Sequence, residues 1–186
     1  MTVYEPYPDR VTVDGKVYRL DLRYDLVLRA MDAQAEDALS QEDKVDVMLR
    51  ILLKRRPPKD MTLRVRILQA IMDLFPHGDK PQARYIDFKQ DARLIRSAFL
   101  RMGIDLTKSR MHFMQFLELL GDIPDDTALA RVIDIRRRPV PEPTQHNGKQ
   151  IAALMEAKAK VAIRLPEEEQ RRAFAASLKQ SNVLRG

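Results

Sequence analysis

The spacing of apolar residues changes near Leu22, and this change limits the folds open to the chain. Before it, apolar side chains alternate in two short runs, residues 11–13 and 17–20, separated by Asp14-Gly15 and Lys16. Alternation is typical of strands, and Asp-Gly suits a tight connection because both central residues of a type I′ turn need positive φ. After Leu22, apolar residues recur at every third or fourth position, as on one face of a helix. The sequence therefore predicts a mainly α-helical protein with a short N-terminal β-hairpin.

Capping residues and helix breakers divide the following stretch into six expected helices. We expect the core to include Phe99 and Phe116, and the fifth helix to be the most buried because apolar residues cover more than one of its faces. The first helix is expected from Leu22 onward, with Leu26, Ala30 and Met31 on its apolar face. The other five are expected from Ser40 to Arg56, from Asp60 or Thr62 to Pro76, from Asp87 or Asp91 to Gly103, from Ser109 to Gly121, and around Leu129 to Ile135.

A proline-rich stretch at residues 139–143 marks a change in composition. It predicts a stiff linker over 139–150, after a helical core domain over 1–138 and before a helical C-terminal extension over 151–186. The extension has only narrow apolar stripes, with Leu154 in one helix and Phe174 and Leu178 in a last helix opened by Pro166. Two arrangements stay open: a tethered extension that reaches a partner, or an ordinary docked pair of helices.

Several kinds of chemistry lack their residues. The chain has no cysteine, which excludes disulfides, thiolate zinc sites and thiol catalysis, and its three histidines lie far apart in sequence. Its six glycines do not cluster, so no glycine-rich phosphate loop is present. Asp122, Asp125 and Asp126 lie close together, but capping of the next helix by Asp125 or Thr127 explains them without a cation. We expect a non-enzymatic protein with no metal and no cofactor.

The N-terminus has no basic stretch followed by an apolar run, and no apolar run approaches the roughly 20 residues that span a bilayer. We therefore expect a soluble protein that does not enter membranes.

Two basic clusters stand out in a chain of net charge +6: Lys54-Arg55-Arg56 and Arg136-Arg137-Arg138. Each adjoins a proline at an expected helix end, where cations favour the helix macrodipole. The alternative is a patch for phosphates or for an acidic partner. Elsewhere the two signs of charge are interleaved, so we do not expect nucleic acid as the partner.

The run from Met111 to Phe116 also has two interpretations. Phe113 and Phe116 fit a helix core, because core is the usual place of an apolar stripe. Methionine-rich surfaces such as Met111 and Met114 also adapt to several partners. His112 beside them lacks an identifiable acid or nucleophile, which favours a hydrogen-bonded structural histidine. Our candidate partner-binding residues are Met111, His112, Phe113, Met114, Phe116, Arg136, Arg137, Arg138, Leu154, Phe174 and Leu178.

Three blocks of the chain resemble a known family. Residues 87–99 (DFKQDARLIRSAF), then 103–106 with 111–120 (GIDL and MHFMQFLELL), then 133–136 (IDIR) are similar to the tail assembly chaperones of siphophages and prophages. The resemblance covers roughly 10–138, and its specific part is 86–136. The family usually has one or two tryptophans directly after the histidine, where this chain has Phe113 and Met114.

Genes of that family typically lie between those of the tail tube and tape measure proteins. The resemblance implies a non-catalytic chaperone of the host bacterial cytoplasm that coats the tape measure protein during tail assembly and is absent from the virion. It implies the tape measure protein as partner, the tail tube protein as a second one, and self-association. The alternatives are a basic DNA-binding, packaging or regulatory protein and a tail completion protein of the virion.

Overall fold

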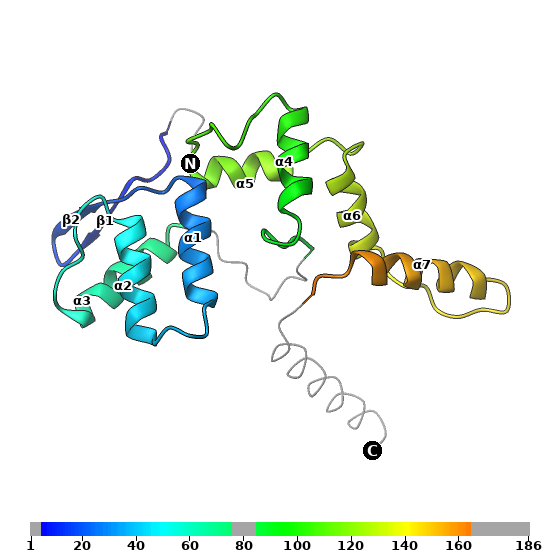
Figure 1. The fold of residues 1–186 in the computed structure, drawn as a ribbon, viewed down its shortest axis with the longest axis horizontal. Coiled ribbons are helices and arrows are strands. Elements are labelled where there is room, and N and C mark those ends of the chain that lie inside the picture. Colours follow the sequence, from blue (N-terminus) through cyan, green and yellow to red (C-terminus); the bar gives the residue numbers. More distant parts are fainter. Residues whose placement is uncertain (1–4, 76–84, 165–186) are drawn as a thin grey trace, which may run out of the picture. The chain divides into compact units, whose positions relative to one another are not determined.

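The computed structural model describes residues 5–75 and 85–164. Within them, seven helices and one two-stranded antiparallel sheet confirm a mainly helical protein with a short N-terminal hairpin (Figure 1). The chain divides into two compact units: Met1–Ala83 with Ile95–Pro124, and Arg84–Leu94 with Asp125–Gly186. The predicted domain boundaries at 138 and 150 follow a change in composition and not spatial compactness, and they stay a prediction.

The hairpin consists of β1 (Arg10–Val13) and β2 (Lys16–Arg19), with Val11 opposite Tyr18. Asp14 and Gly15 both have positive φ, 52° and 72°, which confirms the turn predicted from the Asp-Gly pair. Val11 is buried, whereas most of the other strand residues are exposed, so one side chain fixes the inner face of the sheet.

The chain directly after β2 pairs with two segments far away in sequence. Leu20 forms an isolated antiparallel bridge with Leu53, and Arg23 forms another with His112. Main-chain hydrogen bonds run from Asp21 N to Leu52 O (2.8 Å) and from Phe113 N to Leu22 O (2.8 Å). This short extended segment therefore joins the ends of two helices in the first unit.

The helices of the first unit begin at the expected kinds of residue. Ser40 accepts a hydrogen bond from the Asp43 N–H (3.1 Å), and Asp60 accepts from those of Thr62 and Leu63, which confirms both predicted caps. Gly103 has a φ of 79° and ends its helix in the left-handed conformation, also as predicted. The helices are α1 (Tyr24–Ala35), α2 (Gln41–Leu52), α3 (Met61–Met72), α4 (Ala92–Arg101), in which the two units meet in sequence, and α5 (Phe113–Gly121).

Three predicted helix ends are wrong, and the extended segment explains two of them; the third is that of α3, which ends at Met72 rather than Pro76. Helix α2 stops at Leu52 rather than Arg56, because Leu53 is extended and pairs with Leu20. Helix α5 starts at Phe113 rather than Ser109, because the main chain of Met111 bonds to that of Tyr24 instead (3.1 Å). Helix α1 also differs: it buries Val27 and Ala30, while Met31, which the spacing added to the apolar face, is 45% exposed.

Stacked aromatic rings form the core of the first unit. The ring of Phe116 lies 5.2 Å from that of Phe99 and 5.0 Å from that of Tyr24, both nearly parallel to it. Phe99 is 0% exposed and Phe116 is 1% exposed, so both predicted core anchors are confirmed. The Tyr24 hydroxyl donates to the carbonyl of Leu106, which satisfies the one polar atom of this stack.

The second unit contains α6 (Ala128–Arg137) and α7 (Gly148–Val161), which pack against each other. The Thr127 hydroxyl caps α6 by accepting from the Ala130 N–H (3.1 Å), one of the two caps expected there. Lys158 of α7 donates to the carbonyl of Arg136 (2.8 Å), the kind of contact that a docked extension makes. The predicted last helix, with Phe174 and Leu178, lies outside the described residues. Within those residues, each helix is too short or too polar to cross a membrane.

Replacement of Phe116 by alanine should lower the free energy of unfolding by about 3–5 kcal/mol, because it removes a fully buried ring and leaves a cavity. A urea melt of the full chain measures this loss. Leu100→Ala is the matched control on α4: its side chain is 58% exposed, and the change should cost less than about 1 kcal/mol. Equal losses for the two variants would contradict the assigned core.

Candidate partner-binding surface

Helix α3 has a second apolar face besides the one that it buries. Ile67 and Ile71 are fully buried in the first unit. Met61, Val65, Leu68 and Met72 follow one another at spacings of four, three and four residues, so they form a separate stripe along the helix. Val65 is 50% exposed and Met72 is 44% exposed, while Met61 and Leu68 are half-buried.

This spacing is that of a seam between two packed helices, in which apolar residues repeat every three and four positions. Among the described residues, none covers the side chains of Val65 and Met72 fully, so these two remain exposed to solvent. The stripe was not among the residues predicted from the sequence to bind a partner. The signal was present, because α3 carries more apolar residues than one buried face can use.

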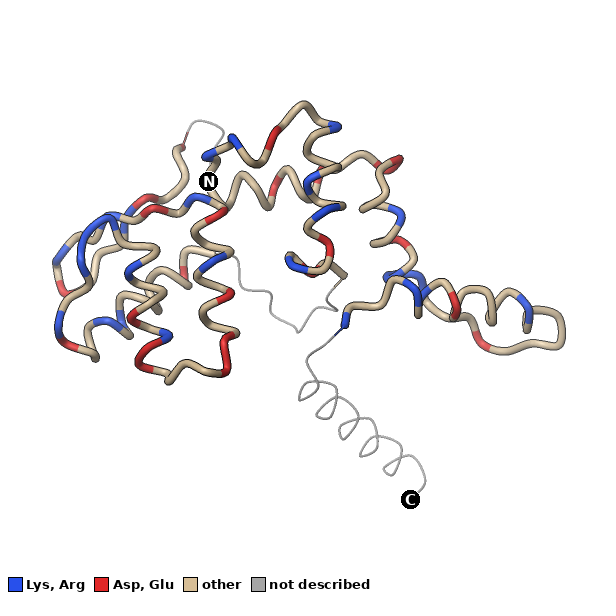
Figure 2. The backbone as a smooth tube through the Cα atoms, viewed as in Figure 1, with Lys and Arg blue, Asp and Glu red and all other residues tan. Residues whose placement is uncertain are grey.

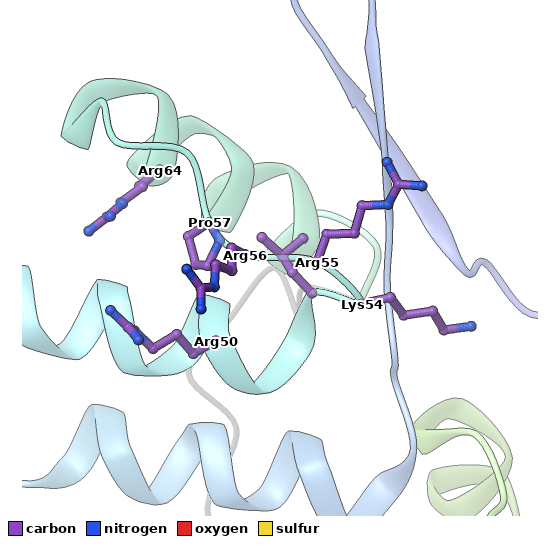
Figure 3. A pocket seen from close by; sticks show the side chains of 7 residues that line it. Arg50, Lys54, Arg55, Arg56, Pro57 and Arg64 are labelled. Atoms are coloured by element: carbon purple, nitrogen blue, oxygen red, sulfur yellow. The ribbon is translucent and has the colours of Figure 1, made fainter.

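A basic groove of about 430 Å³ lies beside the N-terminal end of α3 (Figure 3). It is lined by five cationic side chains together with Leu53 and Pro57. The cations are Arg50, Lys54, Arg55, Arg56 and Arg64. In Figure 2, the Lys and Arg positions gather on the connection from α2 to α3 and on the neighbouring hairpin.

One carboxylate holds two of these arginines in position. Asp46 on α2 lies 2.5 Å from Arg50 Nε through one oxygen and 2.9 Å from Arg64 Nη1 through the other. Arg64 Nε also donates to the carbonyl of Pro58 (2.6 Å). The guanidinium of Arg64 is therefore fixed at the edge of the groove, and it extends toward Arg50 in Figure 3.

The middle of the groove carries charge without an acidic partner. Arg55 and Arg56 are exposed and form no ion pair or side-chain hydrogen bond with any described residue. The pairing of Leu53 with Leu20, and the bond from Lys54 N to Arg19 O (3.1 Å), fix the main chain just before them. Their position is thus set by the fold, while their side chains remain available to a ligand.

The basic surface continues onto the hairpin. A second hollow shares Leu53, Arg55 and Arg56 with the groove and adds residues 16–19 and Arg10. Nearby Asp9 has a lowered pKa, chiefly because Arg10 donates to it, and Lys54 contributes as a further cation. A carboxylate close to this surface is therefore held in its charged form.

The groove and the stripe meet at Arg64. This residue follows Met61 by three positions and precedes Leu68 by four, so it lies next to both on the surface of α3. The cation Arg64 therefore borders the N-terminal half of the apolar stripe. Such a surface can bind a helix that offers an apolar face with acidic residues along one edge.

The Met111–Phe116 run divides between core and surface. Phe113 and Phe116 are 6% and 1% exposed, so in this structure they are core residues and cannot contact a partner. Met111, His112 and Met114 are half-buried. Together with exposed Gln115, these three residues are the part of the run that reaches the surface.

His112 is the N-cap of α5. Its Nδ1 accepts a hydrogen bond from the Met114 N–H (3.1 Å), its Nε2 lies 3.2 Å from the Pro8 carbonyl, and its ring stacks on Tyr7 at 4.9 Å. Burial lowers the pKa of His112, with the Pro8 carbonyl opposing this shift. The neutral ring, with its proton on Nε2, satisfies both contacts, which fits the predicted structural histidine.

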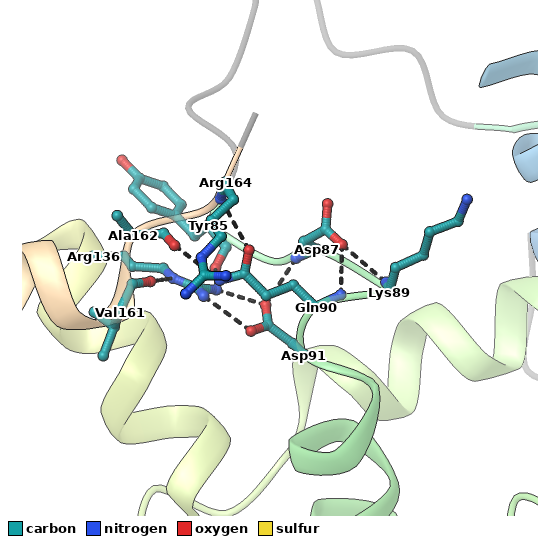
Figure 4. Close-up of polar contacts among 9 residues, drawn as sticks. All are labelled: Tyr85, Asp87, Lys89, Gln90, Asp91, Arg136, Val161, Ala162 and Arg164. Atoms are coloured by element: carbon teal, nitrogen blue, oxygen red, sulfur yellow. Dashed lines mark hydrogen bonds and ion pairs between the residues drawn. The ribbon is translucent and has the colours of Figure 1, made fainter. Parts of the chain in front are cut away.

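Arg136 is buried rather than free (Figure 4). Its guanidinium forms a bidentate ion pair with Asp91, at 2.6 and 2.9 Å, and both side chains are under 10% exposed. It also donates to the carbonyls of Tyr85 (2.8 Å) and Val161 (2.6 Å). Arg136 therefore joins three segments of the second unit and is not available for a partner.

The other predicted residues of the second unit are also placed. Arg137 lies over the ring of Tyr85, 5.7 Å from its centroid, and exposed Arg138 pairs with Asp134 at 2.5 Å. Leu154 is half-buried on α7. Phe174 and Leu178 lie outside the described residues, so their predicted role stays a prediction.

Replacement of Asp91 by asparagine should lower the free energy of unfolding by about 3 kcal/mol or more, because it leaves the buried Arg136 charge unpaired. Asp134→Asn is the matched control: it removes the acid of the exposed pair with Arg138 and should cost less than about 1 kcal/mol. Urea melts at low and high salt measure both. A loss for Asp91→Asn no larger than the control's would show that Arg136 is not the structural tie inferred here.

The model of one protein family, described as Bacteriophage Gp15 protein, matches residues 4–163. Neither the curated proteins nor the solved structures include a match to the sequence. The family match runs through α7 and so includes the groove, the stripe and the Asp91–Arg136 pair. Because it covers far more than half of the chain, the chain belongs to the bacteriophage Gp15 family.

Proposed function

We propose that this bacteriophage protein is a tail assembly chaperone that binds the tape measure protein while the tail tube is built. The exposed apolar stripe on α3 is the observation that carries the proposal. Membership of a bacteriophage family and the similarity of residues 86–136 to the chaperones support it from the sequence side.

The stripe suits the task in two ways. A long helical protein with apolar stripes aggregates unless those stripes are covered, and a helix with seam spacing can cover them. Two of the four stripe residues, Met61 and Met72, are methionines, whose flexible side chains adapt to different partner sequences. Many weak contacts from many copies would hold a long partner, and each contact could be displaced as tube subunits arrive.

The proposed role needs no catalysis and no cofactor. It implies a protein that acts in the cytoplasm of the host bacterium, associates with itself, meets the tail tube protein as a second partner and is absent from the finished virion. Mass spectrometry of purified particles tests the last point and separates the chaperone from a tail completion protein.

DNA binding is the second candidate, and the five cations of the groove favour it. A protein that neutralises several DNA phosphates loses affinity steeply as salt rises, by about 10³–10⁵ between 50 and 200 mM for six to ten contacts. A protein that binds through an apolar stripe keeps most of its affinity. A salt titration of binding therefore separates the two functions.

Co-expression with the tape measure protein encoded beside this chain tests the chaperone role. We expect the tape measure protein to move from the insoluble to the soluble fraction and to co-purify with the chain. The double variant Val65→Ser/Met72→Ser should lose this effect, because it removes the two exposed stripe residues. Leu100→Ser, an exposed apolar residue on α4, is the control and should behave as wild type. A tape measure protein that stays insoluble with the wild-type chain would contradict the proposal.

A further inference from the structure

The basic groove adjoins the apolar stripe at Arg64, and the two together specify more than an apolar partner. The groove lies at the N-terminal end of α3. Beyond Arg64, the one other cation of this helix is Arg66, which already pairs with Asp14 of the hairpin turn. A partner helix lying along the stripe would therefore meet cations over one part of its length only. The charges of that partner then decide which way it lies.

We infer that the groove recognises acidic side chains on a partner helix and so fixes the direction and register of that helix along α3. This inference rests on the proposed function and names the chemistry of its partner. The occupant is an amphipathic helix of another protein, with apolar residues at seam spacing and carboxylates gathered at the end that meets Arg55 and Arg56.

The geometry favours carboxylates for two reasons. Arg55 and Arg56 have no acidic partner among the described residues, so a bound carboxylate would pair with charges that are now only solvated. Asp46 already pairs with Arg50 and Arg64 through its two oxygens, which demonstrates how an acidic side chain is held by the arginines at this edge.

The surroundings favour a peptide over a nucleic acid. Leu53 and Pro57 form part of the groove wall, and the adjoining stripe exposes Val65 and Met72. A phosphate backbone would contact the cations and leave these apolar groups in water, whereas an amphipathic helix covers both. Charge alone therefore does not account for the whole surface.

Two synthetic peptides test the inference on the full chain. Both are about 20 residues long, enough to be helical, and share the same leucine seam. One carries glutamates flanking the seam at one end, and the other carries lysines at those positions. Fluorescence anisotropy should give at least about tenfold tighter binding for the glutamate peptide.

Variants locate the contact. Arg55→Gln/Arg56→Gln should weaken the glutamate peptide by about threefold to tenfold and leave the lysine peptide unweakened. Arg93→Gln/Arg96→Gln on exposed positions of α4 changes the net charge equally and should leave both affinities as in wild type. Val65→Ser/Met72→Ser should weaken both peptides. Unchanged thermal melts establish that each variant is folded.

Direction is read from a spin label at the acidic end of the glutamate peptide. Paramagnetic broadening of the Met61 methyl signal should clearly exceed that of Met72, because Met61 lies at the groove end of the stripe. Equal broadening of the two methyl signals would overturn the inferred direction.

Other outcomes overturn the inference itself. Equal affinity for the two peptides would mean that the groove does not select acids. Duplex DNA that displaces the glutamate peptide at about 150 mM salt, where the Debye length is about 8 Å, would assign the groove to nucleic acid. A dimer that dissociates only in Arg55→Gln/Arg56→Gln would assign it to a second copy. The peptide test does not use the tape measure protein, so the two proposals can fail separately. If the tape measure protein stays insoluble on co-expression but the chain still prefers the glutamate peptide, only the proposed function is contradicted.

Discussion

The pairing of one short extended segment with two distant parts of the chain organises the first unit. Leu20 pairs with Leu53 and Arg23 with His112, so residues 20–23 link the end of α2 to the start of α5. The same bonds remove Leu53 and His112 from helical geometry and thereby set where the two helices stop and start. They also fix the main chain that leads to Arg55 and Arg56. The basic groove therefore depends on the main-chain pairing of Leu53 with Leu20.

Much of the fold follows from local sequence. The Asp14-Gly15 turn, the Ser40 and Asp60 caps and the left-handed Gly103 depend on interactions within a few residues, and sequence patterns record such interactions directly. The ends of α2 and α5 were predicted wrongly because distant pairing decides them. No local signal distinguishes an extended Leu53 from a helical one, because its pairing partner, Leu20, lies far from it in the sequence.

The two basic clusters illustrate the same limit for the candidate site. In sequence they are nearly equivalent: three consecutive cations, each next to a proline. In the structure, Asp91 pairs with Arg136 inside the second unit, whereas Arg55 and Arg56 have no acidic partner among the residues described. Of the cluster that we predicted for a partner, Arg136 makes a buried structural contact, while Arg137 lies over the ring of Tyr85 and Arg138 pairs with Asp134 at the surface. The apolar stripe beside the other cluster could have been found by asking whether α3 carries more apolar residues than its buried face needs.

The stripe on α3, and not the Met111–Phe116 run, is the central claim about how this bacteriophage protein holds a partner. The chain has nine methionines, so both the stripe (Met61 and Met72) and the run (Met111 and Met114) carry methyl groups that can be labelled. A titration of the ¹³C-methyl-labelled chain with a soluble fragment of the tape measure protein tests the claim most directly. We expect the signals of Met61 and Met72 to shift while those of Met111 and Met114 stay in place. Shifts confined to Met111 and Met114 would contradict it.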